Sequence, residues 1–160
     1  METKVDQRKQ KYIIRVKDLY DQVKKWIKAK KLIAKEKEVE LNEEMSGIYK
    51  VPGLLIEDKE GKKIAELQPA GAWIIGAEGR VDIIGIIDRA YLVYLQIEGP
   101  HMKMSVSSSA EKVEEISRPL FKGVDQPGWY WIENKPRGKA RLVDSELFID
   151  LLSEVSDYEL

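Results

Sequence analysis

The sequence of 160 residues contains no cysteine and a single histidine, His101. The absence of cysteine excludes disulfide bonds, thiol catalysis and cysteine-ligated metal sites. One histidine excludes metal sites that need several imidazoles, and it removes the most common proton shuttle from the rest of the chain. His101 lies in a predicted loop, and we interpret it as a solvated side chain rather than a catalytic one. We therefore expect neither a metal site nor a cofactor.

Long hydrophobic runs are also missing. No apolar stretch approaches the roughly 20 residues that a membrane-spanning helix needs. The N-terminal stretch METKVDQRKQKY has no apolar segment of the kind found in a secretory signal. The chain is 43% hydrophobic and 34% charged, which is the composition of a folded globular protein. We expect one domain, residues 1–160, in the cytoplasm.

The charged residues are unevenly distributed, although the net charge is only −1. Residues 1–38 hold 13 Lys and Arg against 6 Asp and Glu, a net charge of +7, and the remainder carries −8. Such an asymmetry can attract a partner of either sign. It can also bind the basic segment to the acidic remainder of its own chain, which is the interpretation we favour.

Residues 1–36 are predicted to form a long basic helix. Between positions 11 and 34, apolar residues recur every three or four positions, the period of an amphipathic helix. They are Tyr12, Val16, Leu19, Val23, Trp26 and Ile33. The opposite face is rich in lysine, whose aliphatic stem can cover apolar surface while the ammonium group stays in water. We interpret this segment as a helix that covers a sheet; binding to a membrane surface or to a partner's groove is the alternative.

Residues 37–143 are predicted to form an antiparallel sheet of about six to eight strands. The segments LLIEDKEGKKIAEL and AWIIGAEGRVDIIG each place glycine between two apolar arms, as hairpins do. The second segment has glycines at positions 76 and 79, a spacing that raises the question of a phosphate-binding loop. Such loops lead into a helix, whereas here β-branched residues follow. We therefore predict a hairpin corner at residues 76–79, with Gly79 in the left-handed conformation.

The second half of the chain adds a central strand and a short helix. The segment AYLVYLQI, residues 90–97, is apolar on both faces and therefore predicts a strand inside the sheet. A loop or irregular edge strand follows it. Ser108 and Glu111 then have the spacing of a capping box, which predicts a short helix near residues 109–117.

The C-terminal part is predicted to contain one more hairpin and a final helix. The segment GWYWIENKPRGKARLV gives the hairpin, and residues 144–156 form a helix that is capped by Asp144 or Ser145. The fold class is therefore α+β: a long N-terminal amphipathic helix, an antiparallel β-meander, and a C-terminal helix packed on the sheet.

One candidate binding surface combines tryptophans with cations in the predicted C-terminal hairpin. Two tryptophans share one strand face, and basic residues alternate through the turn and the return strand. The surface consists of Trp129, Trp131, Lys135, Arg137, Lys139 and Arg141. Aromatic side chains beside cations can stack single-stranded nucleic acid. Buried tryptophans on a cationic edge strand explain the same pattern, and we favour that explanation.

A second candidate is a pocket between the long helix and a curved sheet. Its polar groups would be Asp82, Tyr91, Tyr94 and His101. Asp82 interrupts an apolar strand face, where burial could perturb its pKa. We expect instead that it pairs with Arg80 or Arg89, or that it lies where the face opens to water.

Our leading functional hypothesis is a non-enzymatic cytosolic protein-binding domain, such as an adaptor, accessory or immunity-like protein. The charge asymmetry and the Trp/Arg-rich surface support it, because tryptophan, tyrosine and arginine are enriched in interface hot spots. The partner would be another protein, or a second copy of the chain in a homodimer. The alternatives are a small-molecule binder or enzyme that uses the pocket, and a single-stranded nucleic-acid binder that uses the tryptophan surface.

Overall fold

The computed structural model describes residues 3–74, 76–96, 101–107, 113–119, 123–133 and 138–159; for 101–107 and 113–119 it describes the backbone only. The fold is α+β, as predicted. The helices are α1 (Lys4–Lys28) and α2 (Ser145–Val155). The strands are β1 (Ile33–Glu43), β2 (Gly47–Glu57), β3 (Lys63–Gly71), β4 (Arg80–Ile84), β5 (Arg89–Leu95), β6 (His101–Ser107), β7 (Val113–Pro119), β8 (Gly128–Ile132) and β9 (Ala140–Leu142).

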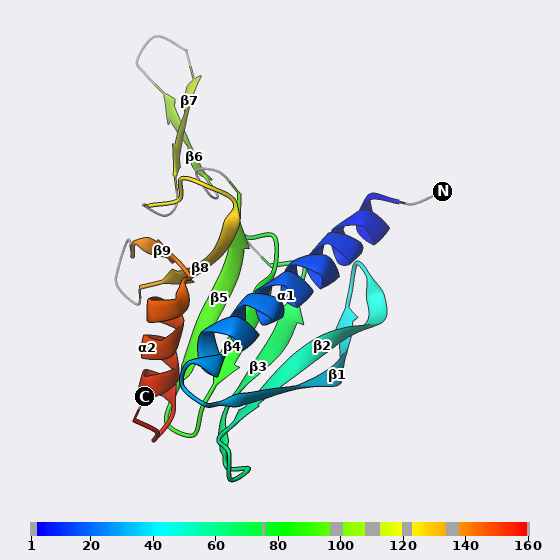
Figure 1. Ribbon diagram of the computed structural model, residues 1–160. Coiled ribbons are helices and arrows are strands. Elements are labelled where there is room, and N and C mark those ends of the chain that lie inside the picture. Colours follow the sequence, from blue (N-terminus) through cyan, green and yellow to red (C-terminus); the bar gives the residue numbers. More distant parts are fainter. Residues whose placement is uncertain are drawn as a thin grey trace.

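Seven strands form one antiparallel sheet in the order β1-β2-β3-β4-β5-β8-β9, and β6 pairs with β7 in a separate two-stranded sheet. Figure 1 shows the β6–β7 hairpin beyond the end of the main sheet, inserted in sequence between the neighbouring strands β5 and β8. The predicted meander and the C-terminal hairpin are therefore confirmed. The turn of that hairpin, residues 134–137, lies outside the described residues.

Helix α1, Lys4–Lys28, is shorter at both ends than the predicted helix, residues 1–36. Thr3 caps it: its hydroxyl accepts a hydrogen bond from the Asp6 amide, and the Asp6 carboxylate completes a capping box. The helix ends at Lys28, and Lys31 then adopts a left-handed conformation with φ of 59°. Ile33, predicted in the helix, is instead the first residue of β1, which suits its β-branched side chain. Within the predicted apolar stripe, Tyr12, Val16, Leu19 and Val23 are buried, and Trp26 is partly buried.

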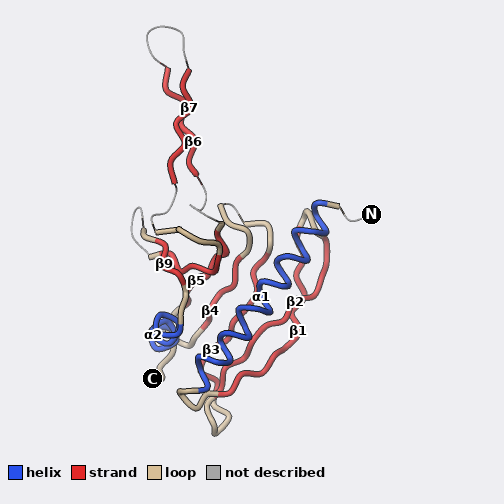
Figure 2. Tube along the Cα trace, turned by 45° about the horizontal axis from the view of Figure 1, so that its top comes forward, coloured by secondary structure: helices blue, strands red, loops and turns tan. Residues whose placement is uncertain are grey.

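The main core lies between the sheet and the two helices. α1 contacts β1 and β2, α2 contacts β3, β4 and β5, and the helices contact each other (Figure 2). Trp26 of α1 packs against Phe148 of α2, with ring centroids 5.7 Å apart. Asp144 caps the start of α2, as predicted: its carboxylate accepts a hydrogen bond from the Leu147 amide at 2.8 Å. Among the described residues, no helix has the length and apolar character needed to cross a membrane.

A second, smaller core explains why the predicted strand at residues 90–97 is apolar on both faces. Leu95, Tyr130 and Ala140 pack with Val124 on the side of the sheet that faces away from Trp129. The corresponding strand, β5, lies between β4 and β8, so its predicted position inside the sheet is confirmed.

The glycine-rich corner joins β3 to β4, as predicted for a hairpin, but its details differ. Strand β3 ends at Gly71, so residues 72–79 form a long connection that is closed by a bridge between Ile74 and Ala77. Gly76, with φ of 80°, adopts the left-handed conformation. Gly79 also has a positive φ, but its value of 159° lies far from the left-handed value of about 57° that we predicted. Two features restrict position 79: L side chains rarely adopt this φ, and a Cβ atom there would lie 2.5 Å from Cδ1 of Tyr12.

Two further predictions are wrong in part. Residues 113–117, predicted as a helix, belong to strand β7, where pairing with β6 supplies the backbone hydrogen bonds. The capping-box residues Ser108 and Glu111 lie outside the described residues. The apolar segment VDIIGII, residues 81–87, favours a strand through Ile87, but β4 ends at Ile84 because residues 85–88 turn.

Candidate functional site

The two tryptophans of the predicted surface face the same side of β8 but differ in exposure. Trp129 is 8% exposed, and its indole N–H donates a hydrogen bond to the backbone carbonyl of Arg15 at 3.1 Å. Trp131 is half-buried, with the exposed Arg141 guanidinium 5.9 Å from its ring centroid. Trp129 therefore belongs to the core and leaves only a small part of its ring accessible.

The cations of this surface are only partly described. Lys139 is exposed beside β9, whereas Lys135 and Arg137 lie outside the described residues. The described part of the surface thus consists of Trp131, Arg141 and Lys139.

The sheet separates the residues of the predicted pocket. Asp82 and Tyr91 are directly paired across β4 and β5. Arg80 joins them: it donates two hydrogen bonds to the Asp82 carboxylate, at 2.7 and 3.0 Å, and its guanidinium lies 4.9 Å from the Tyr91 ring centroid. The hydrogen-bonded Asp82 carboxylate raises the pKa of Arg80. Tyr94 points to the opposite face and packs on Trp129, and the side chain of His101, the first residue of β6, is not described.

A groove does lie between α1 and the sheet, at β5 and β8. We call it the α1–β8 groove; its volume is about 330 Å³. Helix α1 supplies one wall, and the second wall consists of residues from β5, β8, β9 and the segment before β8. The groove is lined by Arg15, Asp18, Leu19, Gln22, Trp26, Tyr94, Gln126, Pro127, Gly128, Trp129, Leu142 and Val143.

Aromatic rings and one arginine form the inner part of the groove. The Tyr94 and Trp129 rings meet edge to face, with centroids 5.6 Å apart and planes at 82°. The Arg15 guanidinium lies over Tyr94, 4.1 Å from the ring centroid, and 3.9 Å from the carboxylate of Glu78. A guanidinium over an aromatic face is a favourable cation–π arrangement. The interior therefore combines apolar surface with one positive charge.

The rim carries hydrogen-bonding groups that are exposed to solvent. Asp18 and Gln22 project from α1, and Gln126 projects from the segment before β8. Leu142 of β9 is 39% exposed, although it is apolar. The α1–β8 groove thus has an aromatic interior, a polar rim and an exposed leucine.

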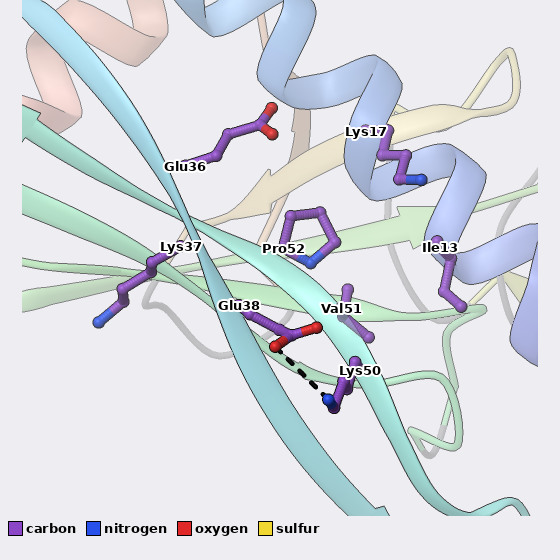
Figure 3. A pocket seen from close by; sticks show the side chains of 8 residues that line it. All are labelled: Ile13, Lys17, Glu36, Lys37, Glu38, Lys50, Val51 and Pro52. Atoms are coloured by element: carbon purple, nitrogen blue, oxygen red, sulfur yellow. Dashed lines mark ion pairs between the residues drawn. The ribbon is translucent and has the colours of Figure 1, made fainter.

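A second depression lies on the other flank of α1, beside β1 and β2 (Figure 3). We call it the α1–β1 hollow; it measures about 380 Å³ and is lined by Ile13, Lys17, Glu36, Lys37, Glu38, Lys50, Val51 and Pro52. Its charges are largely paired within the chain. Glu38 lies 3.6 Å from Lys50, Glu36 lies 2.7 Å from Lys24, and Lys37 pairs with Glu66.

A third depression, the corner hollow, lies at residues 74–78 and meets the α1–β8 groove at Tyr94, which lines both. It is lined by Arg8, Ile74, Gly76, Ala77, Glu78, Tyr94, Leu95 and Gln96. Arg8 fixes this corner by donating hydrogen bonds to the carbonyls of Ala72, at 2.9 Å, and Ala77, at 3.0 Å.

The Glu43 carboxylate and Tyr12 hydroxyl hold the same corner from the other side. Glu43 accepts hydrogen bonds from the amides of Ala72 and Trp73, both at 3.0 Å, and from Tyr49. The Tyr12 hydroxyl donates to the Arg80 carbonyl at 2.7 Å and accepts from the Gly71 amide at 3.2 Å. Burial raises the pKa of Tyr12, so its hydroxyl remains a donor at neutral pH. The position of Glu78 is therefore fixed by a well-bonded loop.

Sequence reasoning missed most of the α1–β8 groove. Arg15, Asp18, Gln22 and Trp26 follow one another at helical spacing and form one flank of α1. No lysine interrupts this flank, whereas lysines are frequent elsewhere on the helix. This lysine-free flank was the one feature of the sequence that could have indicated a binding surface on α1.

Within the described part of the chain, no group of His, Asp or Glu side chains could hold a metal ion. Comparison with family models, with curated proteins and with solved structures finds no match.

Proposed function

We propose that this chain is a non-enzymatic protein-binding domain that holds an extended segment of its partner in the α1–β8 groove. One observation carries the proposal: the groove combines exposed Leu142, aromatic rings and a stacked arginine with amide side chains at the rim. Aromatic residues and arginine are enriched in interfaces, where a few well-packed groups contribute most of the binding energy.

The polar groups of the groove are suited to binding rather than to chemistry. They are one guanidinium, one carboxylate and two amides, from Arg15, Asp18, Gln22 and Gln126, together with the Tyr94 hydroxyl and the Trp26 indole N–H. An arginine stays protonated in proteins, and an amide neither gives nor takes a proton near neutral pH. A single carboxylate with no neighbouring nucleophile or base is a weak basis for catalysis. Amides can, however, bond the N–H and C=O groups of an extended chain.

A small molecule is the alternative ligand for the same groove, whose volume is at the lower end of the roughly 300–1,000 Å³ typical of small-molecule sites. We favour a protein segment because the polar groups lie at the rim, where a chain crossing the groove would meet them. The proposal places the domain in the cytoplasm, which suits a sequence without cysteine.

Filling the groove tests the proposal. Gln22 and Gln10 are both exposed glutamines of α1, but only Gln22 lines the groove. Immobilised wild type, Gln22→Trp and Gln10→Trp would each be used to capture a stoichiometric partner from native lysate. We expect Gln22→Trp to lose a partner that wild type and Gln10→Trp retain, with all three proteins melting at similar temperatures.

Two outcomes contradict the proposal. Equal capture by all three proteins would place the interface elsewhere. If a small molecule, and no protein, were retained by wild type and lost from Gln22→Trp, the groove would be a small-molecule site. A second copy of the chain among the captured proteins would identify a homodimer.

A further inference from the structure

We infer that the partner segment carries an acidic side chain that binds Arg15, and that Glu78 occupies this position in the free protein. The inference rests on the proposed function of the α1–β8 groove and specifies the chemistry of its ligand. It follows from a comparison of the three described arginines whose guanidinium lies 4.1–4.9 Å from an aromatic ring centroid; the exposed Arg141, at 5.9 Å from Trp131, is more distant.

Two of these arginines have close hydrogen-bond partners within the chain. Arg8 lies 4.4 Å from the centroid of Trp73 and donates to two backbone carbonyls at 2.9 and 3.0 Å. Arg80 lies over Tyr91 and donates to both oxygens of Asp82, at 2.7 and 3.0 Å. A guanidinium is a planar fork of donors that is suited to such paired contacts.

Arg15 is stacked in the same way, but among the residues that the structure describes it has no close partner of this kind. Its ion-pair neighbour, Glu78, is 3.9 Å away, beyond the roughly 3.2 Å limit of an N–H···O hydrogen bond. The Arg15 side chain is nevertheless only 19% exposed, and stacking on Tyr94 fixes the plane of its guanidinium. A carboxylate that enters the groove could bond this fork in the way that Asp82 bonds Arg80.

Glu78 is placed so that it can be displaced. Its backbone N–H donates to the Tyr94 carbonyl at 2.8 Å, which fixes the loop, but its side chain is 39% exposed. It lines the corner hollow, whereas Arg15 lines the α1–β8 groove, and Tyr94 lines both. A partner carboxylate on Arg15 would therefore replace a long, solvent-screened ion pair with a shorter, less exposed one.

The test uses a random 12-residue peptide library displayed on phage and selected on the immobilised full-length chain. Phage that also bind Gln22→Trp are removed first, so that the selected peptides depend on the groove. The most enriched peptide is then synthesised and titrated calorimetrically into wild type, Arg15→Gln and Glu78→Gln. Arg89→Gln and Glu44→Gln, both at exposed positions outside the groove lining, control for the change in net charge.

We expect an acidic residue in the enriched peptides. Arg15→Gln should weaken binding by about tenfold or more, as for the loss of a hydrogen bond to a charged group. Glu78→Gln should strengthen binding by up to about fivefold, since it removes a competing surface ion pair. The two control variants should leave the affinity unchanged.

The opposite directions of these two effects separate competition from a merely structural ion pair, whose loss would weaken binding in both variants. Enriched peptides without an acidic residue, an unchanged affinity in Arg15→Gln, or weaker binding in Glu78→Gln would overturn the inference while leaving the proposed function in place. If no peptide distinguishes wild type from Gln22→Trp, the proposed function fails as well.

Discussion

The two flanks of α1 present depressions of similar size but opposite chemistry. The α1–β1 hollow is lined mainly by charged side chains, and these pair with one another or with nearby residues (Figure 3). The α1–β8 groove has aromatic rings and Arg15 in its interior and polar groups at its rim; in the described part of the chain, Arg15 has only a distant ion-pair partner. Volume alone would not distinguish them.

The difference shows why satisfied charges make a poor binding site. A ligand in the α1–β1 hollow would have to compete with existing ion pairs such as Lys24–Glu36, and the apolar side chains that it would meet there are aliphatic rather than aromatic. In the α1–β8 groove, a ligand could cover Leu142 and reach a guanidinium that stacking already orients. The α1–β8 groove therefore favours binding, because its apolar surface is preformed and a few of its polar groups can bond a ligand.

The largest loss of stability that we predict follows from replacing a tryptophan in the interior of the α1–β8 groove. Trp129→Ala should lower the free energy of unfolding by about 3–5 kcal/mol, because it removes a buried indole from the core. Trp131→Ala should cost less, about 1–2 kcal/mol, since that ring is half-buried. Urea unfolding of both variants measures the difference. Equal losses of unfolding free energy would contradict the assignment of Trp129 to the core and of Trp131 to the surface.

A smaller effect should follow from crowding the corner that carries Glu78. Gly79→Asn should cost about 1–3 kcal/mol, because any Cβ atom there overlaps the Tyr12 ring. Gly61→Asn is the control: Gly61 has φ of 86° with open space around it, and asparagine adopts left-handed backbone readily, so the cost should stay below about 1 kcal/mol. Thermal unfolding would compare the two. Similar stabilities would show that Tyr12 does not restrict position 79.

The smallest change in stability that we predict concerns the ion pairs of Glu66, beside β1. Burial alone would raise the pKa of Glu66, but hydrogen bonds from Lys37 and Lys63 outweigh it and hold that pKa below its ordinary value. Ionised Glu66 therefore stabilises the fold above the pKa of the unfolded chain, near 4.3, and the contribution is lost as the pH falls through the lower folded-state pKa.

Replacing this carboxylate tests the sign of the effect. Glu66→Gln should lower the free energy of unfolding by about 0.5–1 kcal/mol at pH 7, and its deficit relative to wild type should shrink below about pH 4. Urea unfolding at both pH values would measure it. A deficit that grows with acidity would contradict the assigned direction of the pKa shift.

The elements that sequence reasoning predicted are those that local patterns specify. The apolar stripe from Tyr12 through Val23 placed α1, and Asp144 placed the start of α2. The local signal was insufficient where pairing with another strand decided the structure. Residues 113–117 followed a capping signal yet pair with β6, and Ile33 continued the helical stripe yet begins β1.

The α1–β8 groove could not be assembled from local patterns, because curvature of the sheet brings its parts together. Trp129 reaches the carbonyl of Arg15 across 114 positions of sequence, and Glu78 meets Arg15 only because the corner folds against α1. The alternation along β8 predicted correctly that Trp129 and Trp131 share a face. It could not show that α1 covers this face at Trp129.

The comparison of the two flanks can be tested directly by photocrosslinking. A photoreactive residue with a slender aliphatic diazirine side chain, which does not fill the groove, would replace Gln22, in the α1–β8 groove, or Lys17, in the α1–β1 hollow; both positions are exposed on α1. Irradiation in native lysate followed by mass spectrometry measures the yield of crosslinked partner at each position. We predict a specific protein adduct from position 22 and none above background from position 17. Equal yields, or an adduct from position 17 alone, would contradict the assignment of the binding site to the α1–β8 groove.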